Sequence, residues 1–297
     1  ASGLSRVGES WELSGMPGSE SVVAEGPWAG STLSELIGRF GAELLGKANY
    51  ARFGQEFPLL VKFIDAREDL SIQVHPDDEL ARKRHGKSGK CEMWYVLEAE
   101  PGASLLTGFS RPIAPAEYER RVADNTLTDV LNRQAIASGD VFYLPAGRVH
   151  SIGKGSFIVE IQQSSDITYR IYDFDRRDAA GNSRELHTEL AREAIDFESS
   201  ENSRITYAPE NNQEVRLVTT PYFTTSLYTL TARTRCDWSA TDSFVAIVLL
   251  QGSGSLTDNE GNRIDVRQGE TWLLPASTQW TEITPHTAPL RLLTSRI

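Results

Sequence analysis

Three short segments place potential metal ligands in a pattern that fits β-strands. In one of them, Ser71, Gln73 and His75 alternate with apolar residues. Successive side chains of a strand point to opposite faces, so this segment predicts a strand with one polar face and one face that packs into a core. Glu92 and His150 lie on two further predicted strands. Because a barrel brings strands distant in sequence around one interior, the pattern predicts a β-barrel that encloses a polar site.

Short apolar runs separated by Gly and Pro recur along the chain, which is typical of a mainly β protein. The predicted strands are Leu59–Asp65, Leu70–Val74, Glu92–Glu98, Asp140–Leu144, Ser156–Gln163, Phe244–Leu250 and Thr271–Leu274. The predicted helices are Thr32–Ile37 with Ser31 as N-cap, Asp77–His85, Ala116–Val122, Leu127–Asn132 and Leu186–Ile195.

The segment Gly139–His150 has an echo in Gly269–Trp280, with the same spacing between its glycine, its proline and its last residue. The echo keeps the turn but has Trp280 in place of the histidine, so it predicts a second β module without a metal site. The predicted division is an N-terminal catalytic domain at 1–197 with a helical insert at about 111–138, a polar linker at 198–214, and a degenerate second domain at 215–297.

Composition restricts the classes of function. The formal net charge of −11 argues against a nucleic-acid surface. No apolar run reaches the roughly 18 residues of a membrane span, so we expect no membrane partner. Cys91 and Cys236 are too few and too far apart for a disulfide scaffold, which favours a reduced, cytoplasmic location. A monomer and a homodimer are both compatible with the sequence.

Two imidazoles, a carboxylate and an amide oxygen form the candidate ligand set, namely Gln73, His75, Glu92 and His150. Without a thiolate, this set suits Zn²⁺, Fe²⁺, Mn²⁺, Co²⁺ or Ni²⁺. A divalent ion would leave the site with a net positive charge, which favours an anionic oxygen ligand. The alternative is that the two histidines are ordinary polar residues near turns.

The segments that carry these residues resemble known families. Gly139-x5-Pro145-x-Gly147-x2-His150 is similar to the second cupin motif. The segments that resemble short bacterial type I mannose-6-phosphate isomerases are Gly8–Glu12, Leu70–Pro76, Gly89–Tyr95, Ser165–Asp173 and Arg184–His187. The resemblance spans most of residues 8–197 and implies two cupin modules, that is, jelly-roll β-barrels.

This resemblance implies a Zn²⁺-dependent enzyme, with one Zn²⁺ per chain, that interconverts mannose 6-phosphate and fructose 6-phosphate. The ligands that it implies are Gln73, His75, Glu92 and His150. It further places the family's active-site arginine at Arg170, its substrate-pocket serine and lysine at Ser71 and Lys90, and an acidic residue at Asp166. Trp11 is expected at the wall of the substrate pocket, with core packing as the alternative. The implied partner is a small sugar phosphate.

Aldose–ketose isomerisation needs a base for the carbon-bound proton and positive charge for the developing oxyanion. Lys90 shares a strand face with Glu92, so it can serve as the base or stay charged and bind phosphate. Asp166 is a rival base, and Glu160 and His187 are weaker rivals. Arg170 can supply the positive charge. Its alternative role is a structural ion pair with Asp173 or Asp175.

Two other classes of function remain open from the sequence. A cupin oxygenase that uses Fe²⁺ would explain the two histidines and Glu92 but leaves Gln73 and Arg170 without a role. A sugar-binding cupin without catalytic activity would need no bound metal. Neither alternative uses all of the residues in the pattern.

Overall fold

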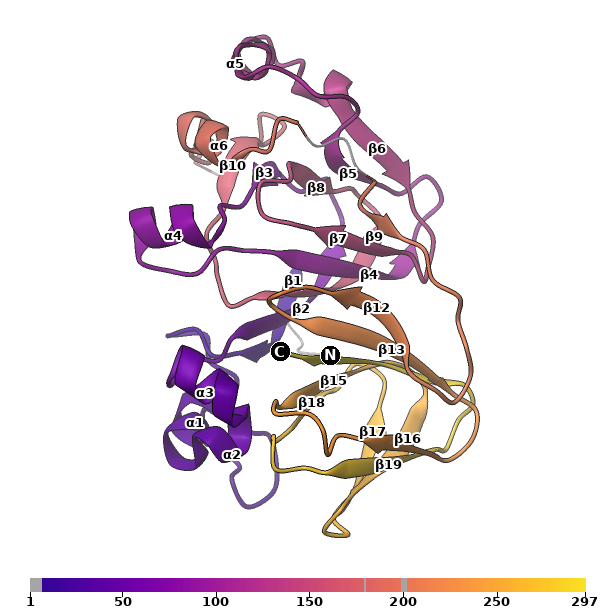
Figure 1. The fold of residues 1–297 in the computed structure, drawn as a ribbon. Coiled ribbons are helices and arrows are strands. Elements are labelled where there is room, and N and C mark those ends of the chain that lie inside the picture. The colour runs from indigo at the N-terminus through magenta and orange to yellow at the C-terminus, as the bar shows by residue number, and fades with distance from the viewer. Residues whose placement is uncertain (1–6, 179, 199–201) are drawn as a thin grey trace. The chain divides into compact units, whose positions relative to one another are not determined.

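The prediction of a mainly β protein is confirmed. A computed structural model describes residues 7–178, 180–198 and 202–297, and these residues form four antiparallel sheets with short helices between the strands (Figure 1). Parts of the predicted N-terminal domain (1–6 and 179) and of the predicted linker (199–201) lie outside the described residues. None of the helices in the described ranges is both long enough and apolar enough to cross a membrane.

Contacts divide the described chain into two units. One unit comprises the residues up to Ser10 and residues 61–205, and the other comprises residues 11–60 and 206–297. Residues 11–60 therefore group with the C-terminal residues, whereas the predicted division assigned them to the N-terminal domain. Local sequence patterns do not predict this grouping, because it depends on side-chain contacts across almost 200 residues.

Three such contacts lie within the second unit. The rings of Phe57 and Phe244 have centroids 4.7 Å apart, and Asn49 donates a hydrogen bond to Ser243 Oγ at 3.2 Å. The Asp242 carboxylate accepts hydrogen bonds from two backbone N–H groups at the start of a helix, at 2.7 and 2.9 Å. Contacts of this kind attach the early helices to the strands near residue 244.

Two sheets hold most of the first unit. The six-stranded sheet has the order β1 (Glu9–Ser14), β2 (Leu59–Ala66), β9 (Ser156–Gln163), β4 (Glu92–Ala99), β7 (Val141–Leu144) and β11 (Arg204–Ile205). The five-stranded sheet has the order β10 (Tyr169–Tyr172), β3 (Ile72–Val74), β8 (His150–Ile152), β5 (Ser104–Phe109) and β6 (Leu131–Ala135).

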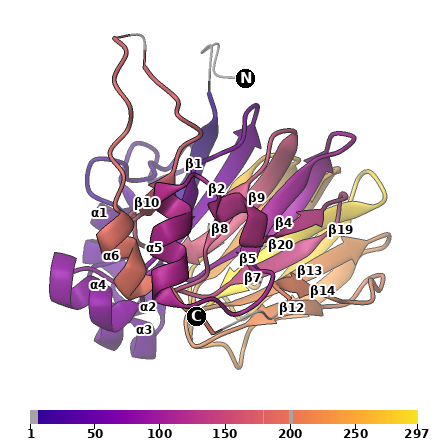
Figure 2. The same ribbon diagram turned by 90° about the horizontal axis from the view of Figure 1, so that it is seen from above.

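The helices of the first unit are α4 (Asp78–His85), α5 (Pro115–Ala123), the 3₁₀ turn η1 (Leu127–Val130) and α6 (Thr188–Ala194). Both views place α5 and α6 side by side, and Tyr118 of α5 donates a hydrogen bond to the Thr188 carbonyl at 3.0 Å (Figures 1 and 2). The predicted helix Leu127–Asn132 ends earlier than expected. Leu131 begins β6 instead, because it pairs with Phe109 of β5.

The second unit contains the helices and strands that remain. Its helices are α1 (Leu33–Phe40), α2 (Ala42–Leu45) and α3 (Lys47–Phe53). One sheet has the order β12 (Val215–Thr219), β13 (Thr224–Leu230), β20 (Leu290–Arg296), β15 (Val245–Gln251) and β18 (Thr271–Leu274), and the other has the order β14 (Thr234–Asp237), β19 (Trp280–Pro285), β16 (Ser253–Asp258) and β17 (Arg263–Arg267).

Helix α1 begins one residue later than predicted. Thr32, not Ser31, is the N-cap, because its hydroxyl accepts from the Glu35 N–H while the Glu35 carboxylate accepts from the Thr32 N–H. These reciprocal bonds form a capping box that satisfies two backbone donors at the start of the helix.

The predicted alternation along β3 is confirmed. Ile72 and Val74 are fully buried in an apolar cluster that also contains Tyr169 and Ile171 of the neighbouring strand β10. Gln73 lies between them and points to the opposite face. The apolar face therefore anchors β3 in a core, and the polar face is left for the site.

Candidate metal centre

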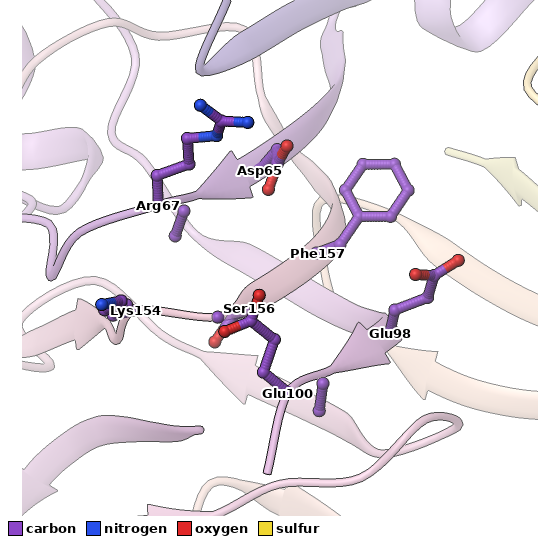
Figure 3. Close-up of a pocket in the computed structure, with 10 residues that line it drawn as sticks. Asp65, Arg67, Glu98, Glu100, Lys154, Ser156 and Phe157 are labelled. Atoms are coloured by element: carbon purple, nitrogen blue, oxygen red, sulfur yellow. The ribbon is translucent and has the colours of Figure 1, made fainter. Parts of the chain in front are cut away.

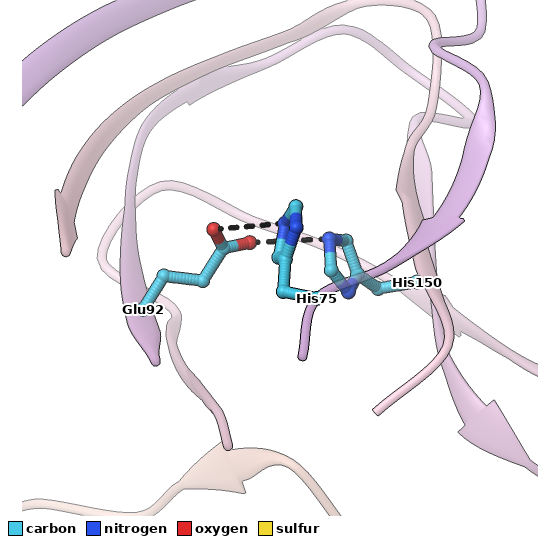
Figure 4. A group of neighbouring side chains, drawn as sticks. All are labelled: His75, Glu92 and His150. Carbon is cyan, nitrogen blue, oxygen red and sulfur yellow. Dashed lines mark ion pairs between the residues drawn. The ribbon is translucent and has the colours of Figure 1, made fainter. Parts of the chain in front are cut away.

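The two sheets of the first unit each contribute residues to one polar cluster. Gln73 is in the centre of β3, His75 follows that strand, and His150 is the first residue of β8 in the same sheet. Glu92 is the first residue of β4 in the other sheet. Figure 4 shows the carboxylate of Glu92 facing the two imidazoles from the other side.

A tight turn ties the two histidine segments together. The N–H of Gly147 donates to the His75 carbonyl at 2.9 Å, three residues before His150. Gly147 has φ +86°, and a Cβ atom there would come within 3.0 Å of the Ala194 carbonyl. Both features favour glycine, so the Pro-x-Gly turn in the sequence has a direct role in placing the imidazoles.

The cluster is compact and buried. Glu92 Oε2 is 3.4 Å from His75 Nε2, and Glu92 Oε1 is 3.2 Å from His150 Nε2. Potential ligand atoms of the three residues all lie within 4.8 Å of one another. All three side chains are almost completely removed from solvent.

Hydrogen bonds fix the orientation of both imidazoles. Nδ1 of His75 is 2.8 Å from the Ile167 carbonyl, and Nδ1 of His150 is 2.8 Å from the Arg148 carbonyl. A carbonyl only accepts, so in each ring Nδ1 carries the proton. The unprotonated Nε2 atoms, which can bind a metal, therefore face Glu92.

The electrostatics keep the imidazoles neutral and the carboxylate charged. Burial lowers the pKa of His75 to about 3, with a further contribution from the Lys90 charge, and burial also lowers the pKa of His150. Burial alone would raise the pKa of Glu92, but Lys90 and the imidazoles outweigh it, so that this pKa falls well below its usual value.

These protonation states leave acceptors facing acceptors. Two Nε2 lone pairs point at an ionised carboxylate at 3.2–3.4 Å, and the Lys90 ammonium, 3.0 Å from Glu92 Oε2, contacts that carboxylate without the alignment of a hydrogen bond. Buried acceptors without donors are costly. A divalent cation would satisfy all three groups, so the donor set fits a metal ion.

Gln73 belongs to the cluster by position. It is the direct cross-strand partner of His150, and its amide Nε2 is 3.3 Å from His150 Nε2. Its Oε1 atom accepts from the hydroxyl of the buried Ser71 at 3.4 Å. To bind a cation through oxygen, as predicted, the amide group has to turn over so that Oε1 faces the imidazoles.

Lys90 lies inside the cluster, two residues before β4 begins. Its ammonium is 3.0 Å from Glu92 Oε2 and 3.1 Å from His75 Nε2. Burial alone would lower the pKa of Lys90, but the carboxylates of Glu92 and Glu160 outweigh it and the pKa is raised. Lys90 is only 5% exposed, so it is not a solvated surface lysine.

Sequence reasoning missed Lys62 and gave Glu160 only a minor place. Glu160 Oε1 lies 3.6 Å from Lys62 Nζ and 4.0 Å from Lys90 Nζ, while Oε2 accepts from Trp94 Nε1 at 2.9 Å. The signal for Lys62 was present, because it is the one cation in the apolar run Leu59–Ile64 and lysine is rarely buried without a partner.

Arg170 lies on the strand next to Gln73. The two residues are direct partners in the β10–β3 pair, so their side chains share a face. Arg170 Nη1 donates to the Glu185 carbonyl at 3.1 Å. The Asp173 carboxylate pairs with Arg176 and Arg184 instead, so none of the described carboxylates forms an ion pair with Arg170.

Asp166 and His187 make their contacts outside the cluster. Asp166 is exposed and forms an ion pair with Lys87 at 2.8 Å. Trp11 is a half-buried residue of β1 and belongs to the second unit. His187 accepts the backbone N–H of Arg170 through Nδ1 at 3.2 Å. The structure thus brings Lys90 into the buried cluster, Arg170 next to it, and leaves Asp166 at the surface.

A separate pocket of about 540 Å³ opens at the other end of β4 from Glu92 (Figure 3). Its charged residues have mixed signs, with Arg67 and Lys154 near Glu98 and Glu100, and they are exposed. None of the predicted site residues lines it. This pocket is therefore distinct from the His75–Glu92–His150 cluster.

The fold and the cluster define a mainly β protein of the cupin class with a candidate metal site. Residues 4–107 match the family "Phosphomannose isomerase type I, catalytic domain". The chain is 35% identical over 270 residues to mannose-6-phosphate isomerase of Streptococcus mutans, covering 91% of this chain and 83% of that protein. It is also 35% identical over 274 residues to mannose-6-phosphate isomerase ManA of Bacillus subtilis, covering 91% of this chain and 84% of that protein.

A crystal structure of mannose 6-phosphate isomerase from Bacillus subtilis has a TM-score of 0.86 with this chain, at 31% identity, and the match covers 98% of this chain and 90% of that one. The chain therefore belongs to the type I phosphomannose isomerase family. This match also confirms the predicted fold class of two cupin modules.

Proposed function

We propose that the protein interconverts mannose 6-phosphate and fructose 6-phosphate. The observation that carries this proposal is the buried His75–Glu92–His150 cluster, in which three acceptors face one another in a chain of this family. In the forward direction the proton on C2 of mannose 6-phosphate leaves and a proton is delivered to C1. The carbonyl group moves from C1 to C2 through an enediol.

We propose that Gln73, His75, Glu92 and His150 hold one Zn²⁺ per chain. The cation would act as a Lewis acid toward the sugar oxygens. The neutral imidazoles and the ionised carboxylate suit a divalent ion, and the hydrogen bonds to Nδ1 hold the rings in the tautomer that binds it. Zn²⁺ fits the nitrogen and oxygen donors without requiring a thiolate.

Lys90 is the group that we propose for proton transfer. Burial opposes its charge, but the carboxylates of Glu92 and Glu160 raise its pKa, whereas a divalent cation held by the cluster would lower it, so that the neutral amine would take the C2 proton and the resulting ammonium would deliver a proton to C1. Its Nζ atom contacts Glu92 and His75 in the cluster, whereas the rival Asp166 is exposed and paired with Lys87. The buried carboxylate of Glu160 lies within 4.0 Å of Lys90 Nζ and can hold the ammonium in place. In this arrangement Lys90 is held by the cluster and is not free to bind a phosphate group.

Exchange of the C2 hydrogen tests this assignment separately from net turnover. Mannose 6-phosphate deuterated at C2 would be incubated in ordinary water with wild type, Lys90→Met and Asp166→Asn. We expect Lys90→Met to abolish loss of deuterium and Asp166→Asn to retain it. The reverse result would transfer the role to Asp166.

The activity itself is tested with purified protein, zinc and mannose 6-phosphate, with fructose 6-phosphate as the detected product. Protein treated with a chelator is the negative control. No product from zinc-loaded protein would contradict the proposal. Oxygen consumption with Fe²⁺ would favour the oxygenase alternative, and sugar-phosphate binding without turnover or metal would favour the binding-protein alternative.

A further inference from the structure

One histidine holds the backbone of Arg170 at the edge of its sheet. β10 is the first strand of the five-stranded sheet, so one of its sides has no strand partner. On that side the Arg170 N–H donates to His187 Nδ1 at 3.2 Å, and the His187 N–H donates to the Arg170 carbonyl at 2.7 Å. His187 therefore supplies both hydrogen bonds that a neighbouring strand would otherwise make to Arg170.

The same segment also holds the side chain of Arg170. The Glu185 carbonyl, two residues before His187, accepts from Arg170 Nη1 at 3.1 Å. Residues 185–187 thus contact Arg170 at its N–H, at its carbonyl and at its guanidinium group. A displacement of this segment would move the backbone and the charged group of Arg170 together.

The helix that follows fixes the position of His187. Helix α6 begins at Thr188, and the Ala191 N–H donates to the His187 carbonyl at 2.8 Å. Ala191 is fully buried in the apolar cluster that also contains residues of β3 and β10. Tyr118 of α5 donates to the Thr188 carbonyl at 3.0 Å. His187 is therefore attached to a packed helix and can act as a firm support.

The tautomer of His187 points to a positioning role and not to a base. A backbone N–H only donates, so His187 Nδ1 carries no proton, and the neutral ring has its proton on Nε2. The Nε2 atom lies 3.8 Å from the Glu185 carboxylate. His75 and His150 have the opposite tautomer, with the proton on Nδ1. The lone pair of the His187 ring is already used by Arg170.

These contacts hold Arg170 without offsetting its charge. Among the described residues, no carboxylate forms an ion pair with Arg170, and its acceptors at His187 and Glu185 are a neutral imidazole and a neutral carbonyl. Burial lowers the pKa of Arg170, and repulsion from Arg184 lowers it further. Neutral acceptors fix a guanidinium group and leave its full charge for a developing oxyanion, whereas a carboxylate would offset that charge.

The place of Arg170 makes its exact position important. Arg170 is the cross-strand partner of Gln73, and Gln73 is the partner of His150, so the three residues lie in a row across β10, β3 and β8. Arg170 is therefore close to the candidate metal centre. A shift of about 1 Å in a group that acts on the reacting atoms can lower a rate by roughly 10²-fold.

We propose that His187 is a positioning residue of the isomerase, which fixes Arg170 beside the metal centre through its Nδ1 acceptor and its backbone N–H. This proposal rests on the proposed function, because that function gives Arg170 an oxyanion to stabilise. Loss of the imidazole would leave the Arg170 N–H without its acceptor at the sheet edge. The Glu185 carbonyl would then no longer be held beside the guanidinium group.

The test compares substitutions in the zinc-loaded full chain. His187→Ala removes the acceptor, and His187→Asn keeps an acceptor oxygen on a short side chain. His286→Ala is the matched control, because His286 is an exposed histidine of the second unit. Circular dichroism and zinc content would confirm that each variant is folded and loaded.

We expect His187→Ala to lower kcat by about 10- to 100-fold, because the misplaced Arg170 stabilises the transition state less well. The change in KM should be much smaller, since the contact that is lost acts in the transition state. His187→Asn should recover most of the rate. His286→Ala should have the kcat and KM of wild type.

A double-mutant cycle separates positioning from a general structural role. If His187 acts through Arg170, His187→Ala should have little further effect on kcat once Arg170→Ala is present, because the group that it positions is gone. A purely structural role would multiply the two losses. The proposal is overturned if the losses multiply, or if His187→Ala keeps the kcat of wild type.

Hydrogen exchange of the Arg170 amide, measured by NMR, reports on the contact without turnover. Exchange should be faster in His187→Ala than in wild type and should return toward wild type in His187→Asn. Equal exchange in wild type and His187→Ala would also overturn the proposal. Failure of the proposed function has a different signature, because zinc-loaded wild type would convert no mannose 6-phosphate while Arg170 exchange still depends on His187.

Discussion

Gln73 lies directly opposite His150 in the β3–β8 pair, with its amide nitrogen 3.3 Å from His150 Nε2. This contact places an amide beside the metal-binding face of an imidazole. When a cation occupies the cluster, the same atom would face positive charge, which favours the amide oxygen over the amide nitrogen. The orientation of Gln73 should therefore report on metal occupancy.

Gln73→Leu should lower the affinity for zinc by about tenfold or more, because one oxygen donor is lost and its volume is filled by a side chain that cannot bind. Competition with a chelator of known affinity would measure the change. Gln55→Leu is the matched control, because Gln55 is an exposed glutamine of the second unit and is not part of the cluster. Equal zinc affinity in Gln73→Leu and wild type would remove Gln73 from the ligand set.

His150→Ala should abolish zinc binding and isomerase activity while the protein stays folded. The apolar faces of β3 and β10 pack on the other side of the sheet, so the core does not depend on the imidazole. Metal analysis would check the loss of zinc, an isomerase assay the loss of activity, and circular dichroism the retained fold. His85→Ala is the control, because His85 contacts Tyr169 outside the cluster and its loss should leave zinc content complete.

Arg170→Ala should retain zinc and lose turnover by about 10²- to 10³-fold, the usual effect of removing a fixed donor that stabilises transition-state charge. Steady-state rates and zinc content would be measured together. Arg170→Lys keeps the charge and should recover only part of the rate, because a lysine lacks the planar set of donors. A rate close to wild type in Arg170→Ala would remove this residue from the mechanism.

Local patterns in the sequence predicted the centre of the site well. The alternation of Gln73 and His75 with apolar residues identified a strand face, and the glycine turn before His150 identified the second strand. Both features depend on residues close together in sequence. They were therefore readable without knowledge of the rest of the fold.

Features that depend on distant partners were not predicted. Lys62 is buried because Glu160 lies opposite it on another strand, and its own segment gives only a weak sign of this. Asp166 has the sequence position of an active-site carboxylate, but Lys87 holds it at the surface. The grouping of residues 11–60 with the C-terminal residues has the same origin, since contacts such as Phe57 with Phe244 join segments far apart in the chain.

The Asp173 pair predicts a defined pH dependence of stability. The pKa of the Asp173 carboxyl lies below the ordinary value of about 3.9. Burial opposes ionisation, but hydrogen bonds from Arg184 and Arg176 stabilise the carboxylate and outweigh it. A depressed carboxylate pKa stabilises the fold fully above the unfolded-state pKa, and this contribution is lost as the pH falls through the folded-state pKa.

Asp173→Asn should therefore lower the free energy of unfolding by about 1–2 kcal/mol near neutral pH, which is less than for a fully buried pair because Arg184 is half exposed. The difference in the free energy of unfolding between wild type and variant should narrow as the pH falls below about 4. Urea unfolding at several pH values would measure it. If this difference stays constant at pH values well below about 4, the charge of the Asp173 carboxylate is not the source of the stability difference.

Gly46 should be one of the least replaceable residues in the second unit. It precedes α3 with φ +95°, and a Cβ atom there would lie 2.2 Å from the Asp242 carbonyl oxygen. The backbone of Asp242 cannot retreat easily, because its side chain caps the same helix through Lys47 N–H and Ala48 N–H. Gly46→Ala should therefore destabilise the protein by about 2–4 kcal/mol through strain and steric overlap.

Gly38→Ala is the matched control, because Gly38 lies inside α1 at an exposed position with no atom near its Cβ site, and alanine there should stabilise by about 0.5–1 kcal/mol. Thermal unfolding of both variants would show shifts of opposite sign, and shifts of the same sign and size would mean that the close approach at Asp242 is relieved at little cost.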